Sequence, residues 1–166
     1  CASSGDSVDE WIEDITIGSL TNNSGDDGGY GDHTAGPTAT FSTEGVYNVS
    51  LIPGFTNTVY EEYWRIWIDY NQDGDFDEGN ELAFDAGTAS ENTVTGSITI
   101  PAGATTGNTG LRIQMKYFNS GNRCQNFDFG EVEDYCVTIS TGAAPCDVPT
   151  GITVGNIGET TATVSW

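Results

Sequence analysis

The segment TVYEEYWRIWIDYN, residues 58–71, has the strongest β-strand pattern of the chain. Aromatic and β-branched residues dominate it, and these types pack well on a pleated, half-buried surface. Alternation divides its side chains between two faces of the strand. The inward set is Trp64, Ile66 and Ile68, and the outward set is Tyr63, Arg65, Trp67 and Asp69. The segment therefore predicts a strand with one face in a hydrophobic core.

Shorter runs of the same kind recur between clusters of turn-forming residues. The further predicted strands are 10–20, 38–43, 45–54, 81–87, 92–103, 110–118 and 131–140. Residues 21–36 are polar and rich in Gly, and we expect a long loop there. No segment shows a sustained helical period with caps. The sequence therefore predicts an all-β fold, an antiparallel β-sandwich of jelly-roll type.

The composition is that of a folded but very acidic protein. The chain has 166 residues, with 25 Asp and Glu against 4 Lys and Arg, which gives a formal net charge of −21. This balance disfavours nucleic acid and anionic membrane surfaces as partners, because binding to either depends on basic residues. No apolar run has the length of a membrane span, so no membrane insertion is expected. Such a chain either tolerates its own repulsion or binds cations.

The acid is most concentrated in DYNQDGDFD, residues 69–77, directly after the main strand. Oxygen-bearing side chains stand at positions 1, 3 and 5, and Gly74 stands at position 6, as in the calcium loop of an EF-hand. Position 12 is Asn80 where that loop has a bidentate Glu, and we expect Glu81 to take this role. The predicted Ca²⁺ ligands are Asp69, Asn71, Asp73, Asp75, Asp77 and Glu81.

This loop leaves three interpretations open. The ion is a structural staple, it also touches a ligand, or the loop is a solvated acidic turn without metal. A strand precedes the loop where an EF-hand has a helix, so we predict a calcium loop on a β-sandwich and not a helical calcium sensor.

Four cysteines, Cys1, Cys124, Cys136 and Cys146, suggest two disulfides and an oxidising compartment. Their spacing does not resemble a zinc site, because there is no CxxC and the single His33 is remote. The sequence allows three connectivities. We therefore expect a secreted or cell-surface protein. No signal peptide is visible at Cys1, so we expect a mature or excised fragment.

The composition changes near Thr141, and we divide the chain into 1–141 and 142–166. The first part is the predicted sandwich, and the second begins with a linker-like run. After it, PTGITVGNIGETTATVSW resembles the first two strands of a fibronectin type III domain. About twenty residues cannot form a sandwich alone. We therefore expect one monomeric module of a larger multidomain chain.

A second unusual stretch is FDFGEVEDYCV, residues 127–137. Its GEVEDY, with YWRIWIDYNQDGDF and LRIQMKY, resembles the GEVED domain family of secreted bacterial proteins. GYGDHT, residues 29–34, resembles the family's Tyr-x-Asp-Tyr-Thr turn, with His33 in place of the second Tyr. The resemblance covers 1–140. It implies a calcium-binding accessory sandwich found beside peptidases, glycoside hydrolases and adhesins, and it favours Cys1–Cys124 with Cys136–Cys146.

Strand alternation also assigns the basic residues to one side. If Leu111, Ile113 and Met115 face the core, Arg112, Gln114 and Lys116 face the other way. The inward phase of Tyr135, Val137 and Ile139 buries Glu133 as well, unless a bulge intervenes. A buried Glu needs a partner, and Arg112 is the candidate. The outward bases either form an ionic ladder with the GEVED acids or belong to a binding face.

The leading functional hypothesis is a non-catalytic, calcium-stabilised carbohydrate-binding accessory module, for polysaccharide, in a secreted multidomain bacterial protein. Tyr63 and Trp67 would stack on sugar rings, while Arg65, Arg112 and Lys116 would hold polar groups. The alternatives are a protein-binding or cell-adhesion module attached to a secreted peptidase or surface adhesin, and a ligand-free structural spacer. Catalysis has little support: GxSxG and HExxH are absent, and His33 reads as a turn residue.

Overall fold

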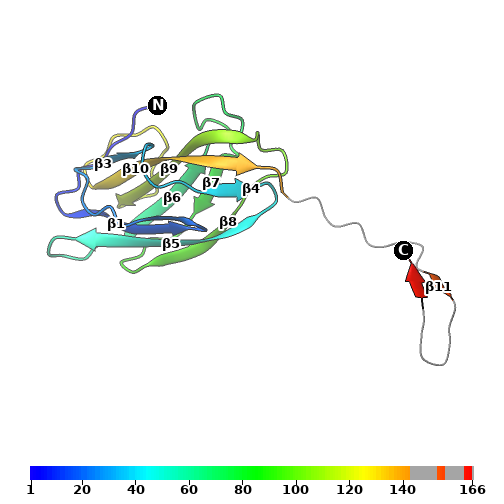
Figure 1. Ribbon diagram of the computed structural model, residues 1–166. Helices are drawn as coiled ribbons and strands as arrows, with labels where there is room; N and C mark the ends of the chain where they lie inside the picture. The colour runs from blue at the N-terminus through cyan, green and yellow to red at the C-terminus, as the bar shows by residue number, and fades with distance from the viewer. Residues whose placement is uncertain (143–152, 156–162, 166) are drawn as a thin grey trace.

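The computed structural model describes residues 1–142, 153–155 and 163–165, with side chains through residue 142. All regular elements in these residues are β-strands. Two sheets lie face to face as a sandwich, with β1, β5 and β8 in one layer and β10, β9 and β6 in the other (Figure 1). The described part contains no helix that is long and apolar enough to cross a membrane.

The first sheet has the order β2-β1-β5-β8, and all its pairings are antiparallel. Its strands are β1 (Glu10–Ile17), β2 (Leu20–Asn22), β5 (Val46–Phe55) and β8 (Val94–Thr99). The pairing of β1 with β5 shifts register between Ile12 and Asp14. This irregularity interrupts the simple alternation that the sequence suggests for β1.

The second sheet has the order β3-β10-β9-β6-β7, and β4 also pairs with β10. Its strands are β3 (Tyr30–His33), β4 (Thr40–Ser42), β6 (Glu62–Ile68), β7 (Leu82–Asp85), β9 (Gly107–Tyr117) and β10 (Gly130–Ser140). The predicted sandwich is therefore confirmed. The prediction of purely antiparallel pairing is wrong for β3 and β4, which run parallel to β10.

Strand β3 also corrects the expectation of one long loop over residues 21–36. It forms because the backbone of Tyr30–His33 pairs in register with Val132–Tyr135 of the GEVED segment. A Gly-rich composition has little local preference for a strand, and a distant partner supplies the missing stabilisation. Local composition could not reveal that partner.

The core lies between the two sheets and contains the side chains that alternation assigned to it. Trp64, Ile66 and Ile68 of β6 are 0–1% exposed, as are Leu111, Ile113 and Met115 of β9. Tyr135, Val137 and Ile139 of β10 are buried with them. These predictions are confirmed. Tyr135 adds a polar hydroxyl to this apolar set.

The outer face of the second sheet is covered by two segments, residues 1–6 and 118–129, which we call the flap. The disulfide Cys1–Cys124 joins them, with a Cα–Cα distance of 5.5 Å. Further hydrogen bonds run from Ser3 Oγ to the Gln125 carbonyl, 2.8 Å, and from Gln114 Nε2 to the Asn122 carbonyl, 3.1 Å. The predicted pairing of Cys1 with Cys124 is confirmed.

Two short strands near the C-terminus, β11 (Thr153–Gly155) and β12 (Thr163–Ser165), pair antiparallel. Cys146 and Trp166 lie outside the described residues. The Cys136–Cys146 disulfide and the fibronectin type III start therefore stay predictions. Cys136 itself is a half-buried residue of β10.

Candidate functional site

The acidic loop begins at the end of β6, and Asp69 forms its first turn. The Asp69 side chain is 5% exposed. Its Oδ1 accepts a hydrogen bond from Gln72 N at 2.6 Å, and its Oδ2 accepts one from Gly74 N at 3.1 Å. Both donors sit at positive φ, 63° for Gln72 and 94° for Gly74. Asp69 thus holds a tight coil that only a few residue types adopt without strain.

The next side chains continue the coil in steps of two residues. Asn71, Asp73 and Asp75 each accept a hydrogen bond from the backbone N–H two positions on, at 2.9, 3.1 and 2.7 Å. These local bonds are typical Asx turns. They bring the carboxylates of Asp73, Asp75 and Glu78 within 4.8 Å of one another. Glu78 was not predicted as a ligand, because the EF-hand template has no ligand at its position.

Glu81 is, with Asp69, one of two buried acids in the loop, and Asn80 before it is exposed. Glu81 Oε1 accepts a hydrogen bond from Tyr70 N at 3.0 Å, whereas Oε2 has no partner. Burial and the neighbouring Glu78 raise the pKa of Glu81 to about 7. A buried carboxylate oxygen without a donor is costly, so this position requires a proton, a water or a cation.

Asp77 does not join the other predicted ligands. Its Oδ1 pairs with Arg123 of the flap, and its side chain is 60% exposed. The structure therefore brings together Asp73 and Asp75, adds Glu78, and buries Asp69 and Glu81 in the same loop. Every candidate donor is a hard oxygen. Such a set fits Ca²⁺, which takes 6–8 oxygen ligands, better than metals that prefer nitrogen or sulfur.

The GEVED acids connect the two sheets. Glu131 is fully buried, and its Oε2 accepts a hydrogen bond from Ile12 N of β1 at 2.9 Å. Its Oε1 accepts hydrogen bonds from Asp27 N at 2.9 Å and Gly29 N at 3.3 Å. Burial raises the pKa of Glu131 to about 7, although these three donors favour the ionised form. Glu131 thus fixes the loop before β3 and the start of β1 against β10.

Glu133 is also buried, as strand alternation predicts, but its expected partner is wrong. Its Oε1 accepts a hydrogen bond from Ser24 Oγ at 2.5 Å, and its Oε2 accepts one from Tyr135 OH at 2.7 Å. Arg112 instead binds Asp134 with two hydrogen bonds of 2.7 Å. The reason is the register, which places Asp134 directly across from Arg112 on the outer face. The expected ionic ladder thus reduces to one bidentate pair.

His33 lies in strand β3, so its prediction as a loop turn residue is wrong. Its Nε2 is 2.8 Å from Asp27 Oδ2 and 3.6 Å from Glu133 Oε1, and its ring stacks on Tyr135. The side chains of Asp27, His33 and Glu133 are close enough together to hold a metal ion. Both Glu133 oxygens already accept a hydrogen bond, one from Ser24 and one from Tyr135, so this carboxylate has protein partners without an ion. No hydroxyl or thiol hydrogen-bonds to His33 among the described residues, so no activated nucleophile is assembled here.

The predicted binding face does not lie open to solvent. Trp67, Arg112 and Lys116 point to the outer side of the second sheet, but they are only 4%, 4% and 7% exposed. Arg65 is committed to Asp85 and to the Gly121 carbonyl, and Tyr63 is half-buried. The expected exposure is wrong because the flap covers this face. Alternation gives the side of a strand but not what lies over it.

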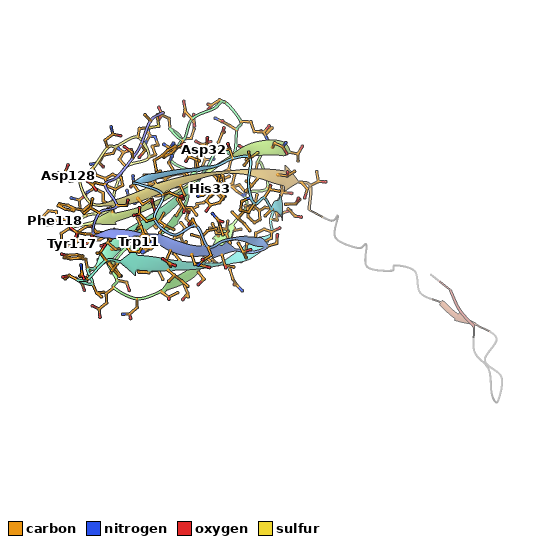
Figure 2. All side chains as sticks on the ribbon, turned by 60° about the vertical axis from the view of Figure 1, so that its left-hand side comes forward. Trp11, Asp32, His33, Tyr117, Phe118 and Asp128 are labelled. Atoms are coloured by element: carbon orange, nitrogen blue, oxygen red, sulfur yellow. A yellow bond between two sulfur atoms is a disulfide. The ribbon has the colours of Figure 1, made fainter. Side chains whose placement is uncertain are left out.

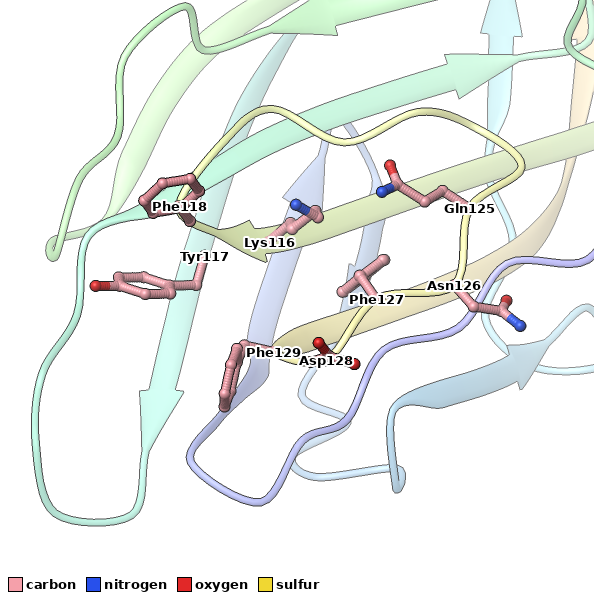
Figure 3. A pocket seen from close by; sticks show the side chains of 8 residues that line it. All are labelled: Lys116, Tyr117, Phe118, Gln125, Asn126, Phe127, Asp128 and Phe129. Carbon is pink, nitrogen blue, oxygen red and sulfur yellow. The ribbon is translucent and has the colours of Figure 1, made fainter.

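Exposed aromatic side chains gather instead at the other end of the sheet. Tyr117, Phe118 and Phe129 are 37%, 77% and 49% exposed. With Lys116, Phe127 and the polar side chains of residues 125, 126 and 128 they line a cavity of about 420 Å³ (Figure 3). Figure 2 places Tyr117, Phe118 and Asp128 toward one end of the sandwich. We call this set of three rings the aromatic end.

Sequence reasoning did not find the aromatic end. Phe118 was included in the predicted strand 110–118, but β9 ends at Tyr117 and Phe118 has a φ of 75°. This conformation is uncommon for a large side chain, and it points the ring into solvent at the start of the flap.

The comparison with protein families connects this geometry to the resemblance. Residues 63–138 match the GEVED domain family model. The matched GEVED segment runs from β6 into β10, and it contains the acidic loop, Arg112, the aromatic end and the GEVED acids. Strands β1–β5 lie before it. Comparisons with curated proteins and with solved structures found no match.

Proposed function

We propose that this domain is a calcium-stabilised, non-catalytic module that binds polysaccharide outside the cell. The observation that carries the calcium part is Glu81. Its side chain is fully buried, and one carboxylate oxygen has no hydrogen-bond donor. The Cys1–Cys124 disulfide supports the extracellular setting, since such bonds persist in oxidising compartments.

Bound calcium would stabilise the fold by relieving repulsion within the acidic loop. Without an ion, the carboxylates of Asp73, Asp75 and Glu78 repel one another across less than 4.8 Å. Two charges at about 4 Å repel by about 4 kcal/mol at an effective dielectric constant of about 20. A bound Ca²⁺ converts this repulsion into ligation and supplies the missing partner of Glu81. The loop then holds the end of β6 and the start of β7 in one arrangement.

Titration calorimetry of the chelator-treated protein tests calcium binding. We expect one Ca²⁺ per chain in the acidic loop, and at least a hundred-fold weaker binding in Glu81→Gln. Asp77→Asn is the matched control, because Asp77 faces Arg123 and not the carboxylate cluster. Absence of Ca²⁺ binding by the wild-type protein at millimolar concentration would exclude the calcium part.

The aromatic end supports the polysaccharide part. Sugar rings stack on exposed aromatic faces, and amides or carboxylates beside the rings bind their hydroxyl groups. Tyr117, Phe118 and Phe129 provide the rings, while Gln125 and Asp128 provide polar groups in the same cavity (Figure 3). The binding face proposed here thus replaces the one expected around Trp67, which is buried.

Affinity electrophoresis in gels that contain soluble polysaccharides tests this part. We expect Phe118→Ala to abolish retardation of the protein and to leave its melting temperature within about 2 °C of wild type, because the ring is exposed. Val46→Ala, a truncation of an exposed side chain on the other sheet, is the control. Retardation that survives Phe118→Ala and Phe129→Ala together would exclude the aromatic end as the binding site.

A further inference from the structure

Two buried carboxylates beside the aromatic end have no partner. Glu10 starts β1 in one sheet, Glu62 starts β6 in the other, and they are 1% and 0% exposed. All four of their carboxylate oxygens lack a hydrogen-bond donor. Buried acids almost always have donors, so such a pair indicates a missing group.

The surroundings of this pair are strongly unfavourable to negative charge. Burial raises the pKa of Glu10 to about 7, and Asp9 and Asp6 add to the effect. Burial and the charge of Glu10 raise the pKa of Glu62 to about 8. A positive charge delivered to this place would therefore be strongly favoured.

The basic residue closest in the fold does not neutralise the pair. The charge of Lys116 opposes the rise in the pKa of Glu62, but the Lys116 ammonium donates no hydrogen bond to Glu10 or Glu62. Its ammonium donates to Asn119 Oδ1 at 2.7 Å and lies over the ring of Phe127. The available cation is thus directed into the flap.

A cavity opens beside Glu10, although Glu62 does not line it and the carboxylate oxygens of both acids are buried. It has a volume of about 240 Å³ and is lined by Asp9, Glu10, Tyr60, Tyr117 and Phe129. The Tyr60 and Tyr117 ring centroids are 5.3 Å apart, and those of Tyr117 and Phe129 are 6.2 Å apart. Tyr117 and Phe129 also line the cavity of the aromatic end, so the two cavities share a wall.

We propose that the polysaccharide bound by this domain carries free ammonium groups, and that one ammonium enters the cavity above Glu10 and Glu62. This inference rests on the proposed polysaccharide function. The ammonium donates to the Glu10 carboxylate, with Glu62 behind it, while its sugar ring lies at the aromatic end. The rings of Tyr60, Tyr117 and Phe129 attract the cation through their faces.

The chemistry favours an ammonium group over a metal ion at this place. Ca²⁺ requires 6–8 oxygens around it, whereas three of the five lining residues present aromatic rings. An ammonium needs about three acceptors and gains from aromatic walls. The formal net charge of −21 adds long-range attraction for a polycation and repels an acidic polysaccharide.

The test compares three oligosaccharides of equal length by titration calorimetry: a glucosamine hexamer, an N-acetylglucosamine hexamer and a glucose hexamer. Saturating Ca²⁺ keeps the acidic loop occupied throughout. We expect the glucosamine hexamer to bind at least ten-fold more tightly than the other two. Glu10→Gln and Glu62→Gln should remove this preference, whereas Glu61→Gln, the same charge change at an exposed neighbour, should retain it.

Phe129→Leu provides a second variant in which both buried acids stay intact, and it should reduce glucosamine affinity by about three- to ten-fold. Equal binding of all three hexamers would overturn the ammonium inference and leave the polysaccharide function standing. Absence of binding to every hexamer would overturn both. If both Glu10→Gln and Glu62→Gln keep the preference for glucosamine, the preference arises from the net charge of the protein, and the inference is overturned.

N-acetyl-lysine amide, which carries a side-chain ammonium, tests for a protein partner. Tighter binding of this compound than of the glucosamine hexamer would indicate such a partner and would also overturn the inference.

Discussion

The two ends of β6 carry acid in opposite ways. After Ile68 the chain enters a contiguous, largely exposed acidic loop whose carboxylates are organised by local backbone hydrogen bonds. Before Tyr63 stands Glu62, a fully buried acid whose neighbour Glu10 comes from the other sheet. We propose a small hard ion for the first arrangement and an ammonium group in a partly apolar cavity for the second. Acid count alone does not distinguish these two situations; burial and neighbours do.

The largest change in melting temperature should come from a substitution in the acidic loop after β6. Glu81→Gln should abolish the gain in melting temperature that Ca²⁺ gives the wild-type protein, which we expect to be roughly 10 °C. The reason is mass action, since a ligand at about a thousand times its Kd stabilises the folded state by about 4 kcal/mol. Calorimetric melting with calcium and with chelator measures it. Equal melting temperatures of the wild type in both buffers would contradict the expectation.

At the start of β6, Glu62 should make the free energy of unfolding fall as the pH rises. Glu62 binds its proton more tightly in the folded state than in the unfolded chain, because burial raises its pKa from 4.5 to about 8. Its contribution to stability is therefore complete below about pH 4.5 and is lost as the pH rises toward 8. Glu62→Gln should flatten this decline by at most about 1.4 kcal/mol per pH unit.

Urea unfolding between pH 5 and pH 8, in saturating calcium, measures the decline. Glu61→Gln should have the wild-type pH dependence, because Glu61 is exposed. A slope in Glu62→Gln that equals that of the wild type would show that Glu62 does not hold its proton in the folded state.

The smallest effect should come from the contact between the acidic loop and the flap. Arg123→Ala removes the ion pair with Asp77, whose side chain is largely solvent-exposed. Exposed pairs contribute at most about 1 kcal/mol, so the melting temperature should fall by no more than about 3 °C. Scanning calorimetry in calcium checks this, and a much larger loss would indicate that the flap supports the loop.

Sequence reasoning predicted the elements that depend on local pattern. The alternation of β6, β9 and β10 was correct at every core position named, and it also identified Glu133 as a buried acid. It failed where a distant segment decides the outcome. The backbone of Tyr30–His33 became a strand only through β10, and Arg112 became buried under the flap, whose Cys1 and Arg123 carbonyls accept hydrogen bonds from its guanidinium.

The candidate sites also divide into those formed by consecutive residues, which the sequence predicts, and those formed by distant segments, which it does not. The acidic loop was found because its residues are consecutive, but the place of Asp77 depends on Arg123, which lies 46 residues further along the chain. Glu10 and Glu62 stand at the start of two strands in different sheets, and no spacing in the sequence relates them. Their meeting is a product of the sandwich.

The Cys1–Cys124 bridge has a mechanical consequence. It joins residues separated by 123 positions, so most of the sandwich lies within one covalent ring. Tension applied between Cys1 and the end of β10 would pass through the disulfide to Cys124 and then along the short segment to Gly130. Strands β1–β9 would carry none of that load through their backbones. The resistance of the domain to pulling would then depend on how firmly β10 is held between β9 and its parallel neighbours β3 and β4.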